Sequence, residues 1–292
     1  MIKMRKIIII ETMGGIGNQL FQYAFGRALS IKTNSILYID KSWFEIDHGD
    51  IYSKRHLFKL EYYACNFKKM NKLIRFVFKK IKTIEEKVFK YDEAYFKKIR
   101  FINKFQGYWQ SYKYFDFIGE RIREEIQIRN KSNEFIVAEQ EIQKNNYICI
   151  HVRRGDYVEN YKVNDRHGVL VIDYYLNAIN YLESKFGEGG RLNKLIFSDD
   201  SEWCTENLKL DRSFKIFDKG NNLNDYEEIM LMSKCRYFVI ANSSFSWWAA
   251  FLSGAKGNHI VAPMTWFKDP DIEPKDIIPI DWVRIRNSFI LF

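Results

Sequence analysis

This sequence contains few of the residues that interrupt secondary structure, form disulfide bonds or bind metal ions. Only 4 Pro occur among 292 residues, which leaves little room for a proline-rich linker. The 4 Cys are far apart and form no CxxC pair, so we expect reduced thiols rather than a disulfide framework. The 5 His are scattered without the i, i+4 spacing of a zinc motif, and we expect no metal site.

Long hydrophobic runs are also lacking. No stretch approaches the roughly 20 apolar residues that cross a bilayer. The run Ile7–Ile10 is too short for a signal peptide, and no small-residue cleavage site follows it. We therefore expect a cytoplasmic protein. Positive charge is in excess at +9, which permits a nucleic acid, a nucleotide, an anionic membrane or an acidic substrate as partner without choosing among them.

The order of apolar and polar segments predicts an α/β protein of two domains. In the second half, strand patterns alternate with helical patterns, which indicates a parallel sheet. The strands are expected at 147–152, 194–197, 214–217, 236–241 and 259–262, and the helices at 173–186, 201–208, 224–234 and 245–253. The polar segment 130–146 predicts the boundary, which gives domains 1–145 and 146–292.

The first half opens with a strand, a glycine loop and a helix. Ile7–Ile10 is the strand, Gly14 to Gly17 is the loop, and Asn18 is the expected helix cap. Further strands are expected at 36–39 and 105–109, and a helix at 113–126. Residues 66–90 are strongly basic with helical apolar spacing, which fits either a solvated outer helix or contact with an anionic membrane surface.

Two adjacent arginines follow the strand 147–152, within the segment His151 to Tyr157. Guanidinium groups are costly to bury without anionic partners and match the geometry of a phosphate. Parallel sheets bind ligands at the carboxyl ends of their strands. Arg153 and Arg154 therefore indicate a pyrophosphate-like ligand, while an internal salt bridge between an arginine and Asp156 is an equally good interpretation.

Three other segments offer polar groups at strand ends. Glycines at Gly15 and Gly17 let a backbone approach an anion, although the loop completes neither a dinucleotide fingerprint nor a Walker A motif. Ser198, Asp199 and Asp200 end a strand and fit either a nucleoside contact or a helix cap. The third segment begins a helix with groups suited to an anion: Asn242, Ser243 and Ser244.

Four segments together resemble the α-1,2-fucosyltransferases of glycosyltransferase family 11. They run in family order and are Gly14 to Ala24, His151 to Tyr157, Phe197 to Asp200 and Ala241 to Trp248. The resemblance implies a GT-B fold, with two Rossmann-like domains facing a cleft. It implies GDP-β-L-fucose as donor and inverting, metal-independent transfer to the 2-hydroxyl of a terminal galactose. Domain 1–145 would face the acceptor glycan, and domain 146–292 would bind GDP-fucose.

The resemblance also implies roles for single residues. Arg153 would contact the β-phosphate and the breaking bond, with Arg154 bracing the loop and His151 nearby. Ser243, Ser244 and Phe245 would bind the diphosphate beside Asn242. One of Asp199, Asp200 or Asp218 would read the guanine next to Ser198, and the loop Gly15–Asn18 would face the fucose.

The general base stays open at this stage. Asp156 and Glu159 are adjacent candidates, and Glu11, Asp40 and His151 are others. Asp269-Pro270-Asp271 has the Asp-x-Asp pattern of many metal-dependent sugar transferases, but it lies in an acidic loop rather than after a buried strand. The acceptor is expected to be a galactose-terminated glycan, with a lipid-linked glycan as one alternative.

Two rivals to this function remain. One is transfer of fucose or another sugar from a GDP donor to a different hydroxyl or to protein. The other is nucleic-acid binding, which only the charge suggests and which no recognisable RNA-binding motif supports. We therefore expect no nucleic-acid partner.

Overall fold

The computed structural model describes residues 5–48, 57–187, 191–208, 214–217, 223–272 and 274–290. The chain divides into two compact units. Unit 1 is Met1–Arg129 with Pro274–Ile277, and unit 2 is Asn130–Glu273 with Ile278–Phe292. In the described ranges each unit has one sheet, and neighbouring strands are parallel in both. The predicted α/β class is confirmed.

The sheet of unit 1 has the strand order β3-β2-β1-β5-β4. Its strands are β1 Ile7–Glu11, β2 Ile36–Asp40, β3 Lys68–Lys69, β4 Thr83–Glu85 and β5 Ile102–Gln106. Ile8, Ile9 and Ile10 of β1 are fully buried, as a central strand of a parallel sheet requires. The strand expected at 105–109 begins and ends earlier, because the chain turns at Gly107 where a side chain would strike Glu86.

Helix α1 (Ile16–Lys32) follows β1 after the glycine loop, as predicted. Gly14 has a φ of 73°, in the left-handed region that favours glycine, and Gly15 is the N-cap. The prediction that Asn18 caps the helix is wrong, because Asn18 lies inside the first turn. Its side-chain oxygen instead accepts a hydrogen bond from Gln110 Nε2 at 2.8 Å.

The basic stretch 66–90 is not one helix, so that interpretation is wrong. It contains β3, the six-residue helix α3 (Lys72–Val77) and β4. The apolar spacing fits a helix, but 68–69 pairs with β2 and 83–85 pairs with β5. Pairing with strands that are distant in sequence overrides the local pattern.

Short helical segments make up much of the remainder of unit 1. They are η1 Ser42–Glu45, η2 Leu60–Tyr62, α4 Ala94–Lys97, η3 Tyr112–Tyr114, η4 Asp116–Ile118 and α5 Gly119–Glu125. The helix expected at 113–126 is therefore broken into pieces. Phe115 leaves the helical conformation between η3 and η4, where its ring is fully buried.

The sheet of unit 2 has the order β11-β10-β9-β6-β7-β8. Its strands are β6 Tyr147–Val152, β7 Asn193–Ser198, β8 Phe214–Ile216, β9 Tyr237–Val239, β10 Ile260–Pro263 and β11 Val283–Ile285. Its helices are α6 Asn133–Gln143, α7 Gly155–Glu159, α8 Tyr161–His167, α9 Ile172–Phe186, α10 Ser201–Asn207, α11 Asp225–Met232, α12 Ser244–Leu252 and the turn η6 Gly257–His259. The five strands and four helices predicted for this half are confirmed to within one or two residues at their ends.

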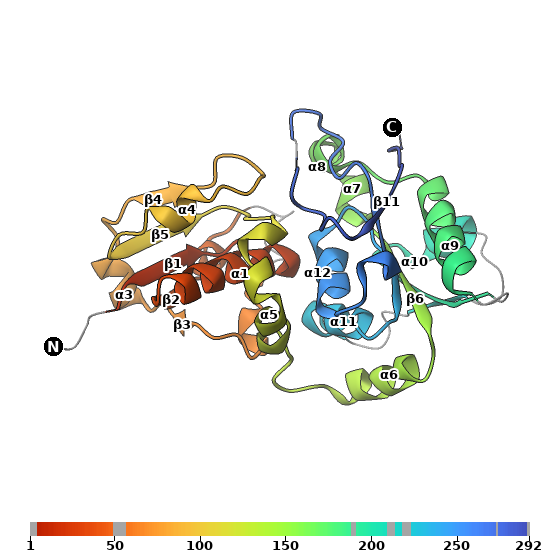
Figure 1. The fold of residues 1–292 in the computed structure, drawn as a ribbon, viewed down its shortest axis with the longest axis horizontal. Helices are drawn as coiled ribbons and strands as arrows, with labels where there is room; N and C mark the ends of the chain where they lie inside the picture. Colours follow the sequence, from red (N-terminus) through yellow and green to blue (C-terminus); the bar gives the residue numbers. More distant parts are fainter. Residues whose placement is uncertain are drawn as a thin grey trace. The chain divides into compact units, whose positions relative to one another are not determined.

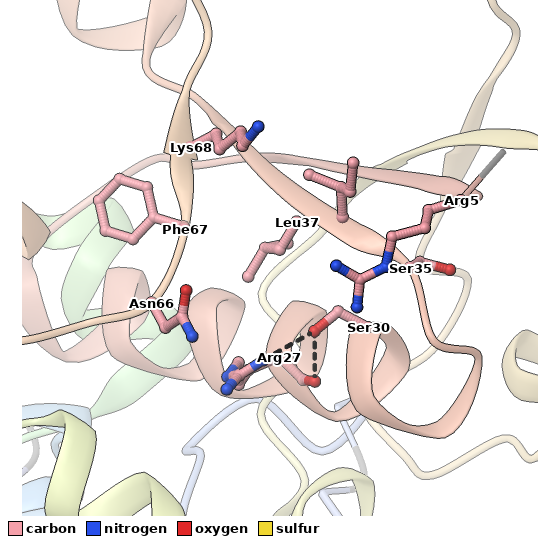
Figure 2. Close-up of a pocket in the computed structure, with 9 residues that line it drawn as sticks. Arg5, Arg27, Ser30, Ser35, Leu37, Asn66, Phe67 and Lys68 are labelled. Carbon is pink, nitrogen blue, oxygen red and sulfur yellow. Dashed lines mark hydrogen bonds between the residues drawn. The ribbon is translucent and has the colours of Figure 1, made fainter. Parts of the chain in front are cut away.

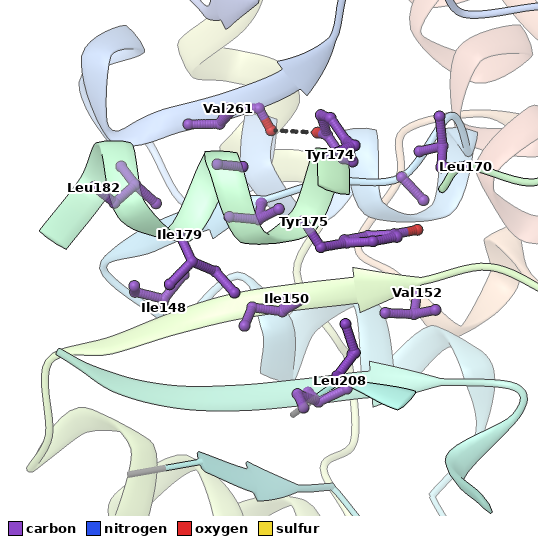
Figure 3. Packing of buried hydrophobic residues seen from close by; sticks show 14 of the residues in the cluster. Ile148, Ile150, Val152, Leu170, Tyr174, Tyr175, Ile179, Leu182, Leu208 and Val261 are labelled. Atoms are coloured by element: carbon purple, nitrogen blue, oxygen red, sulfur yellow. Dashed lines mark hydrogen bonds between the residues drawn. The ribbon is translucent and has the colours of Figure 1, made fainter. Parts of the chain in front are cut away.

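Helices cover both faces of the unit 2 sheet. Figure 1 shows α9 on one side of the strands and α11 and α12 on the other. Figure 3 shows α9 lying over β6, with Tyr175 and Ile179 of the helix above Ile150 of the strand. The Tyr174 hydroxyl donates to the Ile240 carbonyl at 2.6 Å, which satisfies the polar end of a buried ring. This packing fixes β6 and therefore the position of the residues that follow it.

The units divide at residue 129, where the polar segment 130–146 begins, and not at residue 145. Helix α6 belongs to unit 2, since the backbone N–H of Ser132 donates to the Glu227 carboxylate at 3.0 Å. All four cysteines are free and buried. In the described part of the chain, no helix is long and apolar enough to cross a membrane.

Candidate functional site

The strand order of unit 2 predicts where a ligand would bind. The chain starts at the central strand β6, adds β7 and β8 on one side, and then crosses to add β9, β10 and β11 on the other. The order therefore reverses between β6 and β9. In open α/β sheets, ligands bind outside the carboxyl ends of the strands at this point. Arg153 and Arg154 follow β6 directly, and Asn242 and Ser243 follow β9 closely.

Arg153 is held by two carboxylates. Its Nη2 donates to Asp156 Oδ1 at 2.5 Å, and its Nη1 lies 2.9 Å from Asp199 Oδ2. Its guanidinium carbon also lies over the Tyr157 ring at 5.4 Å. Burial lowers the pKa of Arg153, but Asp199 and Asp156 outweigh burial and raise the pKa above its ordinary value. The side chain is 28% exposed, so an incoming anion can reach it.

Arg154 is more deeply buried than Arg153, with 10% of its side chain exposed. Its Nε donates to Asp200 Oδ2 at 2.9 Å, and its guanidinium lies 4.0 Å from the Trp203 ring centre. Its Nη1 is buried, and among the described residues it has no hydrogen-bond partner. A buried, charged N–H without an acceptor is costly, and a phosphate oxygen would relieve that cost.

The carboxylates after β7 also form hydrogen bonds that stabilise the fold. Asp199 Oδ1 accepts from the backbone N–H of Arg154 at 2.8 Å, which ties the ends of β6 and β7 together. Asp200 caps α10, accepting from the N–H of Trp203 at 3.1 Å. The Ser198 hydroxyl accepts from the N–H of Asp200 at 3.0 Å. The cap interpretation of this segment is confirmed, and the salt-bridge interpretation of the arginine pair holds beside it.

The N-terminus of α12 lies after β9, beside the switch point. Ser243 is its N-cap, and its hydroxyl accepts from the N–H of Phe245 at 3.3 Å. The Phe245 ring stacks on His151 of β6, with ring centres 5.6 Å apart. The segment Ser243 to Phe245 and the end of β6 are thus in contact, as the sequence suggested. The first-turn N–H groups of such a helix favour an anion.

Asn242 joins the loops around the site. Its side-chain amide donates to the carbonyls of His167 at 2.8 Å and Trp266 at 3.1 Å. Its own carbonyl accepts from the Tyr157 hydroxyl at 3.2 Å. Asn242 is 2% exposed, so it braces the backbone on which Ser243 stands.

His167 lies beside the site, and the sequence pattern predicted no role for it. Its ring stacks on Tyr157, with centres 4.9 Å apart, and lies 5.3 Å from Phe267. Burial, with smaller contributions from Arg166 and Arg153, lowers the pKa of His167 to about 4. The ring is therefore neutral at pH 7, and its Nδ1 is buried without a hydrogen-bond partner in the ranges that the structure describes. Only the tertiary contacts distinguish it from the other four histidines.

Most of the candidate bases are already engaged. Asp156 pairs with Arg153, Glu11 lies 3.1 Å from Lys104 Nζ, and Asp40 is 1% exposed. His151 is 5% exposed. Glu159, the last residue of α7, is exposed.

Unit 1 has its own switch point, between β1 and β5. Here amide side chains join the two loops. Gln22 of α1 is fully buried, its Oε1 accepts from the N–H of Met13 at 3.0 Å, and its Nε2 donates to the carbonyl of Gly107 at 3.1 Å. The pair of Asn18 and Gln110 adds a second link. These amides join the segment between β1 and α1 to the segment that follows β5.

Glu86 is a second residue that the sequence did not reveal. One oxygen, Oε2, accepts from the N–H groups of Tyr108 at 2.7 Å and Trp109 at 2.9 Å. The other, Oε1, is buried and has no hydrogen-bond partner in the described part of the chain. Burial raises the pKa of Glu86, and the two N–H groups oppose part of the rise. Glu86 follows β4 in a stretch dominated by lysines, and no local pattern marks it as buried.

Two cavities lie elsewhere and do not coincide with the switch points. One, of about 210 Å³, is lined by Arg5, Arg27, Ser30 and Lys68 (Figure 2). Arg27 is already paired with Glu125 at 2.6 Å, and its Nη1 donates to Ser30 at 3.4 Å. The other cavity, of about 580 Å³, lies between α6 and the edge strand β8.

Two further predictions concern metals and the guanine contact. Over the described ranges, no three His, Cys, Asp or Glu side chains are grouped to hold a metal ion. In the loop 269–271, Asp269 Oδ1 accepts from the N–H of Asp271 at 2.9 Å. Asp218 lies outside the described residues.

Comparison with known proteins identifies the family. A model described as glycosyl transferase family 11 matches residues 58–286. The chain is 34% identical to an alpha-1,2-colitosyltransferase from Escherichia coli, over 96% of this chain and 99% of that protein. It is 30% identical to the O-antigen biosynthesis glycosyltransferase WbnK from Escherichia coli, over 87% and 93%. It is 25% identical to galactoside alpha-(1,2)-fucosyltransferase 1 from Rattus norvegicus, over 63% and 51%.

Proposed function

We propose a donor, an acceptor and a mechanism for this chain, which belongs to glycosyl transferase family 11. The donor is GDP-β-L-fucose, and the acceptor is the 2-hydroxyl of a terminal galactose in a glycan. Transfer inverts the configuration at the anomeric carbon. The two units form a GT-B enzyme in which unit 2 binds the nucleotide.

The observation that carries the proposal is the arginine pair at the switch point of unit 2. Arg153 and Arg154 lie where the topology puts a ligand, and together they can neutralise a departing diphosphate. The N-terminus of α12 adds N–H groups on the other side of the same point. Asp156, Asp199 and Asp200 hold the guanidiniums in place until the diphosphate arrives.

In the proposed step, the acceptor oxygen attacks the anomeric carbon from the face opposite the diphosphate. A carbon–oxygen bond forms, the bond to the β-phosphate oxygen breaks, and GDP leaves with the electron pair. The hydroxyl proton passes to a base or to a phosphate oxygen. Two residues of α7 are candidate bases: Glu159, which is exposed, and Asp156, which is paired with Arg153.

The activities for which two of the relatives are named support the linkage. Colitosyltransferase and fucosyltransferase differ in the sugar that they name, but both names specify an α-1,2 linkage. The test is linkage analysis of the product formed from GDP-fucose and a panel of β-galactosides. A product fucosylated at another hydroxyl, or on protein alone, would overturn the acceptor assignment. A salt-sensitive RNA complex in the absence of any GDP effect would overturn the enzyme assignment.

A second candidate donor is GDP-colitose, because the colitosyltransferase covers almost the whole chain at 34% identity. Colitose is L-fucose without its 3-hydroxyl group. A site built to hydrogen-bond that hydroxyl would reject colitose strongly, whereas an apolar site would discriminate only about tenfold. Comparing kcat/KM for the two donors with one acceptor decides between them.

Because the arginines offset the charge, we propose that transfer needs no divalent metal. EDTA should leave the rate unchanged, measured with enzyme that has been dialysed against chelator. A strict requirement for Mg²⁺ or Mn²⁺ would contradict this mechanism.

A further inference from the structure

Charge is concentrated in one short stretch of unit 1. Residues 66–90 contain nine Lys and Arg and two Glu, so nine minus two gives +7 of the chain's net +9. None of the family-like segments falls in this stretch. The function proposed above therefore leaves this charge unexplained.

Helix α3 lies within the stretch and presents three large apolar side chains to solvent. Leu73 is 71% exposed, Phe76 is 77% exposed and Val77 is 63% exposed. Spacings of three and four residues place them on one face of the helix. Leaving three such side chains together in water is unfavourable unless another surface covers them.

The opposite side of α3 is fixed to unit 1. Arg75 Nη1 lies 2.8 Å from Glu45, and Arg75 Nε lies 3.4 Å from the buried Asp40 at the end of β2. Asn71 caps the helix by accepting from the N–H of Ile74 at 2.8 Å. The apolar face is thus held outward and cannot turn into the core without breaking these contacts.

Lysines precede and follow the apolar face of α3 in the sequence. Lys68 and Lys69 are exposed on the edge strand β3. After the helix come Lys79, Lys80 and Lys82, all exposed, and within the described ranges none of these three forms an ion pair. We call Leu73, Phe76 and Val77 with these five lysines the α3 surface.

We propose that the α3 surface binds the face of an anionic lipid bilayer, with Leu73, Phe76 and Val77 entering the headgroup region and the lysines contacting anionic headgroups. Apolar side chains ringed by lysines are the composition of interfacial membrane anchors. A nucleic-acid phosphate backbone would pair with the lysines but would leave the apolar face in water. The bilayer is therefore the partner that satisfies both features.

The test is co-sedimentation of the full chain with vesicles. One set contains phosphatidylglycerol and phosphatidylcholine in equal parts, and the other contains phosphatidylcholine alone. We expect binding to the first set, little binding to the second, and release as NaCl is raised, since screening weakens attraction to the surface.

Two variants separate the two features of the surface. Phe76→Ser should lower the partition coefficient about tenfold by removing apolar contact. The triple variant Lys79→Gln, Lys80→Gln, Lys82→Gln should lower it about a hundredfold by removing charge. Val137→Ser is the matched control, because Val137 on α6 is 68% exposed outside the α3 surface, and it should bind like the wild type.

Four results would overturn the proposal. They are equal binding to both vesicle sets, wild-type binding by Phe76→Ser, an equal loss in Val137→Ser, and a wild-type dimer without vesicle binding that Phe76→Ser converts to a monomer. Transfer to a soluble galactoside should be unchanged in Phe76→Ser. Lack of that transfer in the wild type would count against the proposed function alone, because vesicle binding does not depend on it.

Discussion

The two units are wound alike and differ in the chemistry at their switch points. Each begins at a central strand, adds two strands on one side and then crosses to the other. In unit 2 the loops at that point are joined by ion pairs, such as those from Arg153 to Asp156 and Asp199. In unit 1 they are joined by amides, such as Gln22 between Met13 and Gly107.

The difference indicates that the two switch points have different roles. A partly exposed ion pair exchanges one anion for another at modest cost, so the unit 2 loops can accept a diphosphate in place of a carboxylate. A buried amide that hydrogen-bonds two backbone groups cannot be replaced by a ligand in this way. Removing the amide leaves both backbone groups without partners. We therefore expect substitutions at the unit 2 switch point to affect turnover and those at the unit 1 switch point to affect stability.

The largest expected effect is on turnover, at Arg153. Arg153→Ala should lower kcat/KM about a thousandfold, because the departing diphosphate loses a charged donor. Arg153→Lys should recover only part of this, since lysine lacks the planar fork. Steady-state kinetics measures both, with circular dichroism to verify folding. Arg236→Ala, which changes an exposed arginine in the same unit, is the control, and wild-type turnover by Arg153→Ala would contradict the comparison.

A stability effect of about 2–3 kcal/mol is expected at Gln22 in unit 1. Gln22→Leu keeps the volume but removes the hydrogen-bond partner of the Met13 N–H and the Gly107 carbonyl, which are both partly buried. Urea unfolding measures the loss. Gln127→Leu, at a glutamine whose hydrogen bond is exposed, should cost less than about 0.5 kcal/mol. Equal costs for the two variants would show that the amide link in unit 1 is not what holds its loops.

Acid should weaken unit 2 through His167. Its folded pKa of about 4 lies below the value near 6.5 of the unfolded chain, so the unfolded state binds more protons between these two pH values. This contribution to stability is present above pH 6.5 and is lost as the pH falls toward 4, by about 3 kcal/mol. His167→Gln should remove that slope from unfolding free energies measured between pH 7 and 4. An unchanged slope would assign the acid sensitivity to other groups.

The contribution of Glu86 in unit 1 to stability should change with pH in the opposite direction to that of His167. Its effect should be the smallest of those predicted here. Its pKa is raised by burial, so the folded state binds more protons than the unfolded one, and its contribution to stability falls as the pH rises. Glu86→Gln keeps an acceptor for Tyr108 and Trp109 without the charge. It should raise the unfolding free energy at pH 8 on the order of 0.5 kcal/mol and leave it unchanged at pH 4. A loss of stability at both pH values would mean that the turn needs the carboxylate itself.

Sequence patterns succeeded where each element is decided locally. Strand β6 is a run of apolar residues buried on both faces, and the amphipathic helix α9 has its apolar stripe on the core. The arginines after β6 and the carboxylates after β7 could also be placed at one edge of the sheet. The pairing of Arg153 with Asp199, and of Arg154 with Asp200, depends on β6 and β7 being neighbours, which no local pattern states.

Local patterns failed where a distant strand or loop decides. The stretch 66–90 has the spacing of a helix, yet β3 and β4 form because β2 and β5 offer free edges. Asn18 has the chemistry of a helix cap, but α1 starts two residues earlier, because Gly15 already takes the cap position. The role of Glu86 could be recognised only from its contacts with the turn at Gly107, because a carboxylate inside the fold and an exposed one look the same in sequence.

The sequence by itself determined the α/β class, the family and the charged residues at the end of β6, because apolar periodicity and residue chemistry are properties of the chain before it folds. The tertiary structure decided which carboxylate holds which arginine, why His167 is neutral, and which side chains of α3 remain in water. Those outcomes depend on distances between residues far apart in sequence, and burial and Coulomb interactions act through such distances.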